Sequence, residues 1–462
     1  MPAIMVAGTT SSAGKSTITA VLCRILAKRG YEVAPFKAQN MSLNSYITKN
    51  GKEIAIAQAY QAFAAGIEPD ERMNPVLLKP KGNFVSQLVV LGEAIKDIDF
   101  REYWKELDWI KKIVKDSYES LAEEYEYVII EGAGGIAEIN LYERDLANIY
   151  SARISNPKII IVGDIDRGGV FASLYGSYML LPEDIKPLVK GFIINRLRGS
   201  KEILQNGIRK IEDLCNVKVL GVLPYMSIAL PSEDSLNIEE WKESGPIGIL
   251  KLPRISNYTD FEPVRSVSRF VSLKDDLDNF DIIIIPGSKD TIADLKEMKK
   301  FDADQRLRKI AGNKPIIGIC GGYQMLCKEL IDYGVEHGFL RVKGIGLLDA
   351  ITEFKEFKKI TRQVEKKVTG DAVIIDKIKG EKVWGYEIHK GRTFSSKPIF
   401  EDDGCSSDDG MVWGTYLHGL FWNSNVLRAF EDYLGIRIKI EENWMDILAE
   451  EFEKSVDLSS II

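Results

Sequence analysis

The sequence is poor in the residues that form disulfides and metal sites. Five cysteines (Cys23, Cys215, Cys320, Cys327 and Cys405) and three histidines occur among 462 residues. No two cysteines have the CxxC spacing of zinc or redox sites. A small, odd number of cysteines is typical of a reduced protein, so we expect a cytoplasmic location and no cysteine-based metal site.

Long apolar runs and an excess of positive charge are also missing. No stretch approaches the roughly 20 apolar residues that span a bilayer, and the opening MPAIMVAG enters a strand pattern without the layout of a secretion signal. The formal net charge of -7 at pH 7 argues against a nucleic-acid surface. It leaves room for a local basic pocket that binds an anionic substrate. The oligomeric state stays open.

The order of apolar segments predicts two α/β domains. Short β-branched runs alternate with segments of helical spacing, the pattern of a parallel sheet covered by helices on both faces. A polar stretch over residues 232–245 interrupts this rhythm. We therefore predict domains over residues 1–235 and 246–462, each large enough for its own core. The expected strands are Ala3–Ala7, Val128–Ile130, Lys158–Val162, Gly191–Ile194, Val217–Val222, Ile247–Leu252, Asp281–Ile285 and Pro315–Ile319.

A glycine-rich loop near the N-terminus has the layout of a phosphate-binding loop. It reads GTTSSAGKST and lies between an expected strand and an expected helix. Backbone N–H groups and the positive helix end can hold phosphate oxygens there, while Lys15 neutralises the β- and γ-phosphates. The alternative is a generic glycine-rich turn. The predicted ATP-binding residues are Gly8, Thr9, Gly14, Lys15, Ser16 and Thr17.

The loop is one residue longer than the common form. This long variant resembles the loops of dethiobiotin synthetase-type enzymes, which use ATP to activate a carboxyl group. The segment Glu131-Gly-Ala-Gly-Gly135 follows an expected strand and matches the glutamate–glycine segment of that family. Because a carboxylate there suits Mg²⁺, we predict Ser16 and Glu131 as the metal ligands. The alternative for Glu131 is a simple strand-end turn.

A buried strand that ends in small residues makes Cys320 a candidate nucleophile. The segment reads PIIGICGG, and its glycines permit a sharp turn and the approach of a substrate. A helix that starts after the turn would lower the thiol pKa. Backbone N–H groups at Gly321 and at Gly287, in another strand-end turn, are the predicted oxyanion hole. The pattern resembles the class I glutamine amidotransferases.

A cysteine nucleophile needs a base, and the three histidines are the candidates. His418 follows an apolar strand and stands far downstream of Cys320, which is the chain order of class I amidotransferases. It is the predicted base. His389 is the second candidate, with a structural or substrate-orienting role as its other interpretation, and His337 is expected at the surface. Those enzymes usually carry Glu two residues after the base, where this chain has Leu420. Either another residue orients the imidazole, or a Cys–His dyad suffices.

Further segments, spread along the chain, resemble the cobyric acid synthase family, which shares this departure at Leu420. The sequence differs from the family at a few positions, such as Ser12, where the family commonly has Asp. None of these differences replaces Lys15, Glu131, Cys320 or His418. The matching segments are Pro35-Phe-Lys-Ala-Gln-Asn-Met-Ser-Leu-Asn-Ser45, Met73-Asn-Pro-Val-Leu-Leu-Lys-Pro80, Asp164-Ile-Asp-Arg-Gly-Gly169, Pro253-Arg-Ile-Ser-Asn-Tyr-Thr-Asp260, Pro286-Gly-Ser-Lys-Asp-Thr291, Gly385-Tyr-Glu-Ile-His389 and Tyr416-Leu-His-Gly419.

The resemblance implies two parallel-sheet domains: a P-loop, dethiobiotin synthetase-like domain and a flavodoxin-like glutamine amidotransferase domain. It implies glutamine- and ATP-dependent amidation, with Mg²⁺, of the b, d, e and g carboxylates of adenosylcobyrinic acid a,c-diamide. Acyl phosphates are the implied intermediates. Lys37 and Arg167 are predicted to bind the corrinoid polycarboxylate, and Asp145 is a predicted catalytic residue. The alternative for Arg167 is a surface charge, and the alternative for Asp145 is a loop cap or a salt bridge. No nucleic-acid or membrane partner is implied.

Two rival functions remain at this point. Cobyrinic acid a,c-diamide synthases share both domains, but the segments PFKAQNMSLNS and GYEIHKGRT favour the cobyric acid synthase family. A P-loop partitioning ATPase with a degenerate amidotransferase domain is the non-enzymatic rival. That class needs no reactive thiol, so glutaminase activity that depends on Cys320 separates it from the enzymes.

Overall fold

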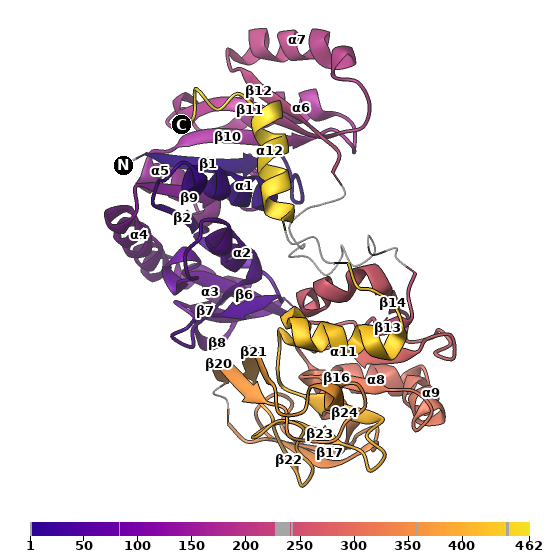
Figure 1. The fold of residues 1–462 in the computed structure, drawn as a ribbon. Helices are drawn as coiled ribbons and strands as arrows, with labels where there is room; N and C mark the ends of the chain where they lie inside the picture. The colour runs from indigo at the N-terminus through magenta and orange to yellow at the C-terminus, as the bar shows by residue number, and fades with distance from the viewer. Residues whose placement is uncertain (1, 83, 227–240, 242–243, 357–358, 440–442) are drawn as a thin grey trace. The chain divides into compact units, whose positions relative to one another are not determined.

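The computed structural model describes residues 2–82, 84–226, 241, 244–356, 359–439 and 443–462. The chain forms two compact units (Figure 1). Their ranges differ from the predicted domains, because residues 43–52 belong to the second unit and residues 441–462 to the first. The predicted boundary at residue 235 lies outside the described residues. The first unit comprises Met1–Ser42, Glu53–Pro231 and Glu441–Ile462, and the second comprises Leu43–Lys52 and Ser232–Ile440.

The main sheet of the first unit has the order β12-β11-β10-β1-β9-β2, and all of its neighbouring strands are parallel (Figure 1). This arrangement confirms the predicted parallel sheet. The carboxyl ends of its strands share one edge, where ligands of open α/β sheets bind. The strands are β1 (Ala3–Gly8), β2 (Val33–Phe36), β9 (Tyr127–Glu131), β10 (Lys158–Asp164), β11 (Val189–Leu197) and β12 (Val219–Pro224).

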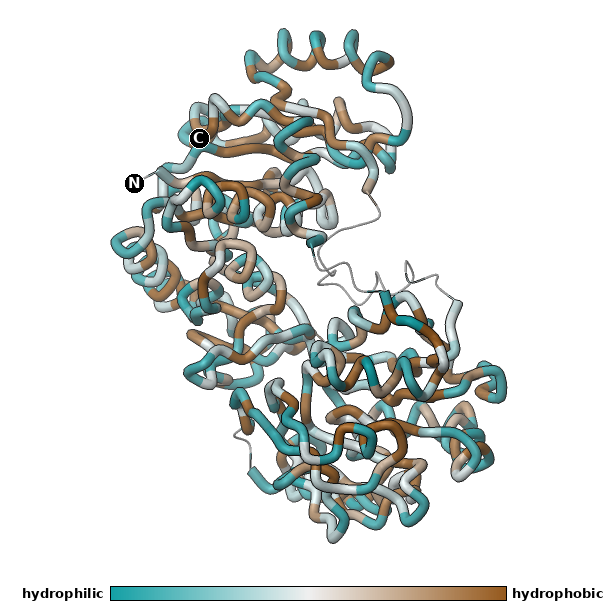
Figure 2. Tube along the Cα trace, viewed as in Figure 1, coloured by the Kyte–Doolittle hydropathy of each residue, from teal (hydrophilic) through white to brown (hydrophobic). Residues whose placement is uncertain are grey.

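Both faces of this sheet are buried, which explains the continuous apolar runs of its strands. Alternate residues point to opposite faces: Met5 of β1 packs into one core cluster, and Ile4 and Val6 pack into another. The middle of this sheet is coloured mostly as hydrophobic in Figure 2. The covering helices are α1 (Lys15–Lys28), α2 (Ile56–Ala64), α4 (Leu107–Glu124), α5 (Ser151–Ser155), α6 (Val170–Leu180), α7 (Gln205–Cys215) and α12 (Trp444–Ser455).

Helix α12 explains why the C-terminal residues belong to the first unit. Its buried residues Leu448 and Phe452 join the same apolar cluster as α1, beside which it lies in Figure 1. Arg24 of α1 donates to Asp446 over 2.7 Å. Because the partly exposed ion pair contributes at most about 1 kcal/mol, burial of the apolar face holds this helix in place.

A second, smaller sheet in the first unit was not predicted from the sequence. Its order is β3-β6-β7-β8, with β6, β7 and β8 joined as antiparallel neighbours. These strands carry polar residues at many positions, so they lack the buried β-branched runs by which the main sheet was predicted. They are β3 (Gln39–Met41), β6 (Val76–Gly82), β7 (Val85–Val90) and β8 (Glu93–Asp99), and α3 (Phe100–Lys105) follows them.

The main sheet of the second unit has the order β14-β13-β15-β16-β24-β23, parallel except at the edge strand β23. This too confirms the predicted fold class. Its strands are β13 (Ile247–Leu250), β14 (Ser268–Val271), β15 (Ile282–Ile285), β16 (Ile316–Ile319), β23 (Cys405–Ser406) and β24 (Val412–Thr415). Its helices are α8 (Thr291–Lys300), α9 (Ala303–Ile310), α10 (Gly321–Leu326) and α11 (Ser424–Leu434).

Two further sheets extend the second unit. Strands β18-β17-β19-β22 form one, and the hairpin β20-β21 forms the other. The bounds are β17 (Cys327–Tyr333), β18 (Phe339–Lys343), β19 (Leu348–Phe354), β20 (Ile360–Lys367), β21 (Lys382–His389) and β22 (Arg392–Ser395). None of the helices in the described part of the chain has the length and apolar character that crossing a membrane requires.

Candidate active sites

The glycine-rich loop of the first unit joins β1 to α1, as its sequence predicts. Gly14 has φ of 104°, a conformation that L side chains rarely adopt. A Cβ atom on Gly14 would also lie 2.2 Å from Nδ2 of Asn195. That amide donates to the carbonyl of Ala13 over 2.9 Å. The turn that precedes α1 is therefore fixed by β11, and only glycine fits its tightest position.

Lys15 is held within this loop by backbone carbonyls. Its Nζ donates to the carbonyl of Thr10 over 2.9 Å and to the carbonyl of Gly134 over 2.8 Å. Gly134 belongs to the segment that follows β9, so the two glycine-rich segments meet at the ammonium group. This places a positive charge at the carboxyl edge of the sheet, where a phosphate would be neutralised.

Glu131, at the end of β9, is almost completely buried and surrounded by donors. Its carboxylate accepts hydrogen bonds from Ser16 (2.7 Å), Lys37 (2.9 Å), Gln58 (3.1 Å) and Gln61 (2.5 Å). Burial opposes ionisation, but the charge of Lys37 and these bonds outweigh it and lower the pKa of Glu131. Glu131 is thus an anion beside the loop. An anionic oxygen next to a hydroxyl oxygen is a donor set that fits Mg²⁺.

The other predicted residues of this unit have clear structural contacts. Asp145 accepts from the backbone N–H and the side-chain amide of Asn148, and so caps the π-helix η2 (Leu146–Tyr150). Burial raises the pKa of Asp145. Arg167 is largely exposed, with its Nε 3.9 Å from the carboxylate of Asp164. That carboxylate makes a closer ion pair, at 2.9 Å, with Arg196.

In the second unit, Cys320 occupies a strained turn between β16 and α10. Its φ of 51° and ψ of -106° lie outside the regions that ordinary residues favour. Strain of this kind is stored where the surrounding structure imposes it, and it is common at nucleophile turns. The neighbouring glycines make the turn possible: a Cβ on Gly322 would lie 1.9 Å from the carbonyl oxygen of Ile285.

We predict that Gly322→Ala destabilises the second unit by about 2 kcal/mol or more, because an unyielding backbone oxygen occupies the space of the new methyl group. Gly176→Ala in α6 is the matched control. No atom lies within 4 Å of its added Cβ, so the better helix propensity of alanine should leave stability unchanged or raise it. Thermal unfolding of both variants checks this, and an unchanged melting temperature for Gly322→Ala would contradict the packing.

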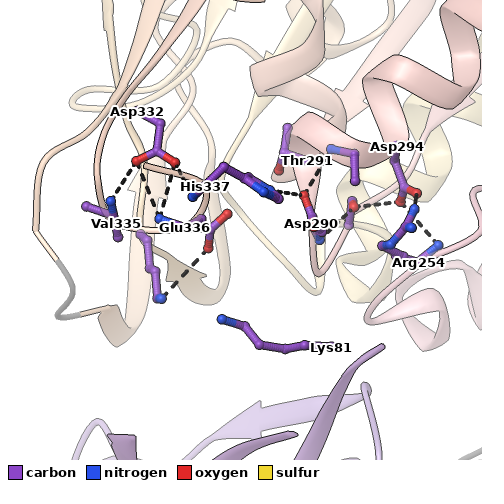
Figure 3. Close-up of polar contacts among 12 residues, drawn as sticks. Lys81, Arg254, Asp290, Thr291, Asp294, Asp332, Val335, Glu336 and His337 are labelled. Carbon is purple, nitrogen blue, oxygen red and sulfur yellow. Dashed lines mark hydrogen bonds and ion pairs between the residues drawn. The ribbon is translucent and has the colours of Figure 1, made fainter. Parts of the chain in front are cut away.

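The turn that holds Gly287 is fixed beside the nucleophile turn. The N–H of Ser256 donates to the carbonyl of Gly287 over 3.0 Å, and the hydroxyl of Ser288 donates to Asp294 over 2.7 Å. Figure 3 shows Asp294, which also pairs with Arg254 over 3.0 Å. A Cβ on Gly321 would lie 2.7 Å from the backbone nitrogen of Ser288. The two segments predicted to supply an oxyanion hole therefore approach each other closely.

His418 is oriented by Asp260, a residue whose role the sequence did not reveal. Nδ1 of His418 lies 2.6 Å from Oδ2 of Asp260, and the N–H of Gly419 donates to Oδ1 over 3.1 Å. Asp260 comes from the 3-10 helix η6 (Tyr258–Val267), which lies far from His418 in the sequence. The carboxylate of Asp260 therefore lies where it can orient the imidazole, and Leu420, at the position where class I enzymes usually carry Glu, is buried in the apolar core.

The charges around His418 favour its protonated form. Burial opposes protonation, but the negative charge of Asp260 and the interaction with Cys320 outweigh burial and raise the pKa of His418 to about 10. Among the described residues, Nε2 of His418 has no hydrogen-bond partner at usual distance, so this nitrogen is left for the thiol. A carboxylate thus orients the imidazole, and its second nitrogen is available to the Cys320 thiol, which is the arrangement that a cysteine nucleophile with an acid–base partner requires.

The remaining histidines do not share this geometry. His389 donates from Nδ1 to the carbonyl of Gly391 over 2.6 Å, and its ring stacks on Tyr416. Burial lowers the pKa of His389 to about 4. His337 is exposed, and its Nε2 lies 2.8 Å from a carboxylate oxygen of Asp290 (Figure 3). Neither of these two histidines has a carboxylate on Nδ1 as His418 does.

Asp260→Asn should make Cys320 alkylation by iodoacetamide slower at neutral pH, because the imidazolium loses its anionic partner and the pKa of His418 falls. In the wild type the charge of Asp260 outweighs burial and helps to raise the pKa of His418 to about 10, so the wild-type alkylation rate should exceed that of the variant throughout pH 7 to 9. In Asp260→Asn kcat for glutamine hydrolysis should also fall about 10²-fold or more. Glu262→Gln, a neighbour on η6 that pairs with Arg265, is the control. Equal alkylation rates for wild type and Asp260→Asn over this pH range would contradict the assignment.

Two family models match the two parts of the chain. Residues 246–426 match the CobB/CobQ-like glutamine amidotransferase domain, and residues 4–236 match the CobQ/CobB/MinD/ParA nucleotide binding domain. The fold and the sites thus define a glutamine-dependent amidotransferase joined to a nucleotide-binding unit.

Two full-length relatives narrow this class. A probable cobyric acid synthase of Archaeoglobus fulgidus is 67% identical over 459 residues, which cover 99% of each chain. A probable cobyric acid synthase of Methanosarcina mazei is 48% identical over 475 residues, which cover 99% of this chain and 98% of the relative. The chain belongs to the cobyric acid synthase family.

Proposed function

We propose that the chain amidates the b, d, e and g carboxylates of adenosylcobyrinic acid a,c-diamide in turn, with glutamine as nitrogen donor and ATP as energy source, to give adenosylcobyric acid. The observation that carries the proposal is that a P-loop with an anionic Glu131 and a Cys320–His418–Asp260 constellation occur in one chain. Its relatives over full length bear the name of this activity.

The second unit would release ammonia from glutamine. The thiolate of Cys320 attacks the side-chain amide carbon, and the resulting oxyanion is held by backbone N–H groups at Gly287 and Gly321. Imidazolium of His418 gives its Nε2 proton to the leaving nitrogen, so ammonia departs and a thioester remains. The neutral imidazole then takes a proton from water, which attacks the thioester and releases glutamate. Asp260 keeps Nε2 directed at the sulfur throughout.

The first unit would activate the substrate carboxylate. Gly8, Thr9, Gly14 and Thr17 belong to the loop proposed to surround the phosphates of ATP, with Lys15 as the cation on the transferred phosphate. Ser16 and Glu131 would hold Mg²⁺, which supplies charge neutralisation when bound. The carboxylate attacks the γ-phosphate to give an acyl phosphate and ADP, and ammonia then displaces phosphate. Like charges oppose this attack, so cations are needed at the site.

The roles of three further residues belong to this proposal. The ammonium group of Lys37, which lies beside Glu131, would neutralise the charge of the incoming substrate carboxylate. Arg167 would pair with a peripheral carboxylate of the corrinoid. Asp145 would accept a proton from the attacking ammonia, since desolvation raises its pKa and makes it a stronger base than a fully solvated carboxylate.

Substrate choice tests the proposal against its closest rival. Purified protein is incubated with Mg·ATP, glutamine and one of two corrinoids, either cobyrinic acid or adenosylcobyrinic acid a,c-diamide. The masses of the products are then measured by mass spectrometry. We expect four new amides on the a,c-diamide. Conversion of cobyrinic acid to a diamide, with the a,c-diamide left unchanged, would identify a cobyrinic acid a,c-diamide synthase instead.

A further inference from the structure

Helix α6, labelled in Figure 1, is uncharged around its whole circumference. Its eleven residues read VFASLYGSYML, whereas α1, α4, α7 and α12, which cover the same sheet, each carry charged residues. A helix on the outside of a sheet normally buries one apolar stripe and presents charged residues to water, and a helix that is hydrophobic on every side is normally buried on every side. The composition of α6 therefore indicates that a further surface covers its outer face.

The inner face of α6 packs closely on the main sheet of the first unit. Val170 and Leu174 are buried in its core, and a Cβ atom on Gly163 of β10 would lie 2.8 Å from Cγ2 of Val170. The opposite face points to solvent: Tyr175 and Met179 are exposed side chains. At 3.6 residues per turn, the spacing i, i+3, i+4 and i+7 places four residues on this outer face. They are Ala172, Tyr175, Gly176 and Met179.

The exposed apolar surface continues from the end of α6 onto a neighbouring segment. The hydroxyl of Tyr142 donates to the carbonyl of Leu180 over 2.9 Å, and Leu180 is exposed, as are Ile139 and Leu141. A stable interface buries about 800 Å² on each partner, which is more than one face of a three-turn helix offers. The neighbouring apolar residues supply the additional area, and contiguous exposed apolar surface of this kind marks a site of association.

The order of small and large residues on the outer face fits a second copy of the same face. Ala172 and Gly176 are small, and Tyr175 and Met179 are large. If two copies of α6 cross antiparallel about a twofold axis between residues 175 and 176, Ala172 faces the partner's Met179 and Gly176 faces the partner's Tyr175. The symmetry repeats both contacts. Each large side chain then lies over a small residue, as close packing of helix ridges into grooves requires.

The exposed charges at the two ends of α6 favour the same orientation. Arg167 precedes the helix and Glu183 follows it, with side chains 67% and 88% exposed. They stand at similar numbers of residues from the proposed axis, so an antiparallel pair brings Arg167 near the partner's Glu183. A guanidinium has five N–H donors, so this contact leaves others for a substrate carboxylate. Such a pair at the rim adds little affinity, but it selects the antiparallel arrangement.

We propose that the outer face of α6 is the contact surface of a symmetric homodimer, in which α6 packs antiparallel on α6 of a second copy of this chain. An uncharged face can be buried in this way without leaving an unpaired charge. A twofold dimer is also the commonest assembly of soluble proteins. The inference concerns assembly and does not depend on the proposed function.

The first test is the mass of the purified full chain, measured by light scattering at micromolar concentration without substrates. We expect twice the mass of one chain for the wild type. Met179→Lys enters the dimer twice, so it should raise the dissociation constant about 30-fold or more, as loss of a central contact does. Tyr175→Lys should act in the same direction. Ile447→Lys is the matched control, because Ile447 lies on α12 and is 41% exposed, against 44% for Met179. Circular dichroism of all variants monitors folding.

The second test is disulfide cross-linking, which reports the orientation of the two helices. The five native cysteines are all buried, so a cysteine placed on the outer face of α6 is the accessible thiol. Ala172→Cys and Met179→Cys are mixed, left to exchange subunits and oxidised gently. We expect a cross-linked dimer in the mixture and far less of it from either variant alone, because each position faces the other across the axis.

A wild type with the mass of one chain would overturn the inference. An unchanged dimer in both Met179→Lys and Tyr175→Lys, or equal dissociation of Ile447→Lys, would also overturn it, because the contact would then lie elsewhere. Cross-linking of Ala172→Cys alone, with no gain in the mixture, would contradict the antiparallel arrangement. Since no substrate is present, none of these outcomes bears on the proposed amidation.

Discussion

Cys320→Ala is expected to abolish amidation with glutamine and to leave amidation with free ammonia at the wild-type rate. Without the thiol no thioester forms, and loss of a nucleophile of this kind costs about 10⁴-fold or more in rate. The nucleotide-binding unit keeps its own loop, its Lys15 contacts and its Glu131 contacts, none of which involve Cys320. Ammonia supplied in solution then replaces the product of glutamine hydrolysis.

The measurement is corrinoid amidation with saturating glutamine and, separately, with an ammonium salt at a pH where free ammonia is present. Cys327→Ala is the matched control: it is a buried thiol in the same part of the fold, with Sγ 3.4 Å from the carbonyl of Tyr323, and burial raises the pKa of Cys327 to about 12. We expect it to keep both activities. Loss of both activities in Cys320→Ala would mean that the thiol is structural.

Lys15→Ala is expected to abolish amidation with either nitrogen source while Cys320 remains reactive. The ammonium group is the cation proposed to screen the phosphates, and its removal should lower the rate of carboxylate activation by about 10³-fold or more. The basal alkylation rate of Cys320, measured without nucleotide, should stay at the wild-type value. This variant is the counterpart of Cys320→Ala, because it stops the other half of the reaction.

Lys28→Ala separates this effect from a general loss of charge on α1. Lys28 lies on the same helix as Lys15 and pairs with Asp446 at 2.8 Å, with nearly half of its side chain exposed. An ion pair of this kind contributes at most about 1 kcal/mol, so we expect near-normal amidation. If Lys15→Ala still amidates the corrinoid with free ammonia, the loop that holds Lys15 is not required for activation of the carboxylate.

The parts that sequence reasoning predicted are those whose physics is local. The β1–loop–α1 connection and the turn at Cys320 each combine a buried strand, closely spaced glycines and a reactive or charged residue within about ten positions. Gly14 and Gly322 are required there because the neighbouring atoms leave no room for a Cβ. The parallel sheets follow from continuous β-branched runs, which only a sheet buried on both faces accommodates.

The features that sequence reasoning missed depend on contacts between distant residues. Asp260 ends the segment Pro253–Asp260, which follows β13. No feature of the sequence near Asp260 indicates that its carboxylate contacts His418. Residues 43–52 carry no composition that distinguishes them from their neighbours, and their place in the second unit follows from partners such as Asn257 and Tyr386. Helix α12 is amphipathic, but its apolar face alone does not say which core buries it.

We propose that this one chain takes nitrogen from glutamine and places it on four carboxylates of one corrinoid. The most direct test supplies adenosylcobyrinic acid a,c-diamide, Mg·ATP and glutamine labelled with ¹⁵N in its side-chain amide, in unlabelled ammonium buffer. With the wild type we expect a product with four new amides that carry ¹⁵N. With Cys320→Ala we expect all new amides to be unlabelled. A wild-type product whose new amides are unlabelled, or no new amide at all with ATP and glutamine present, would contradict it.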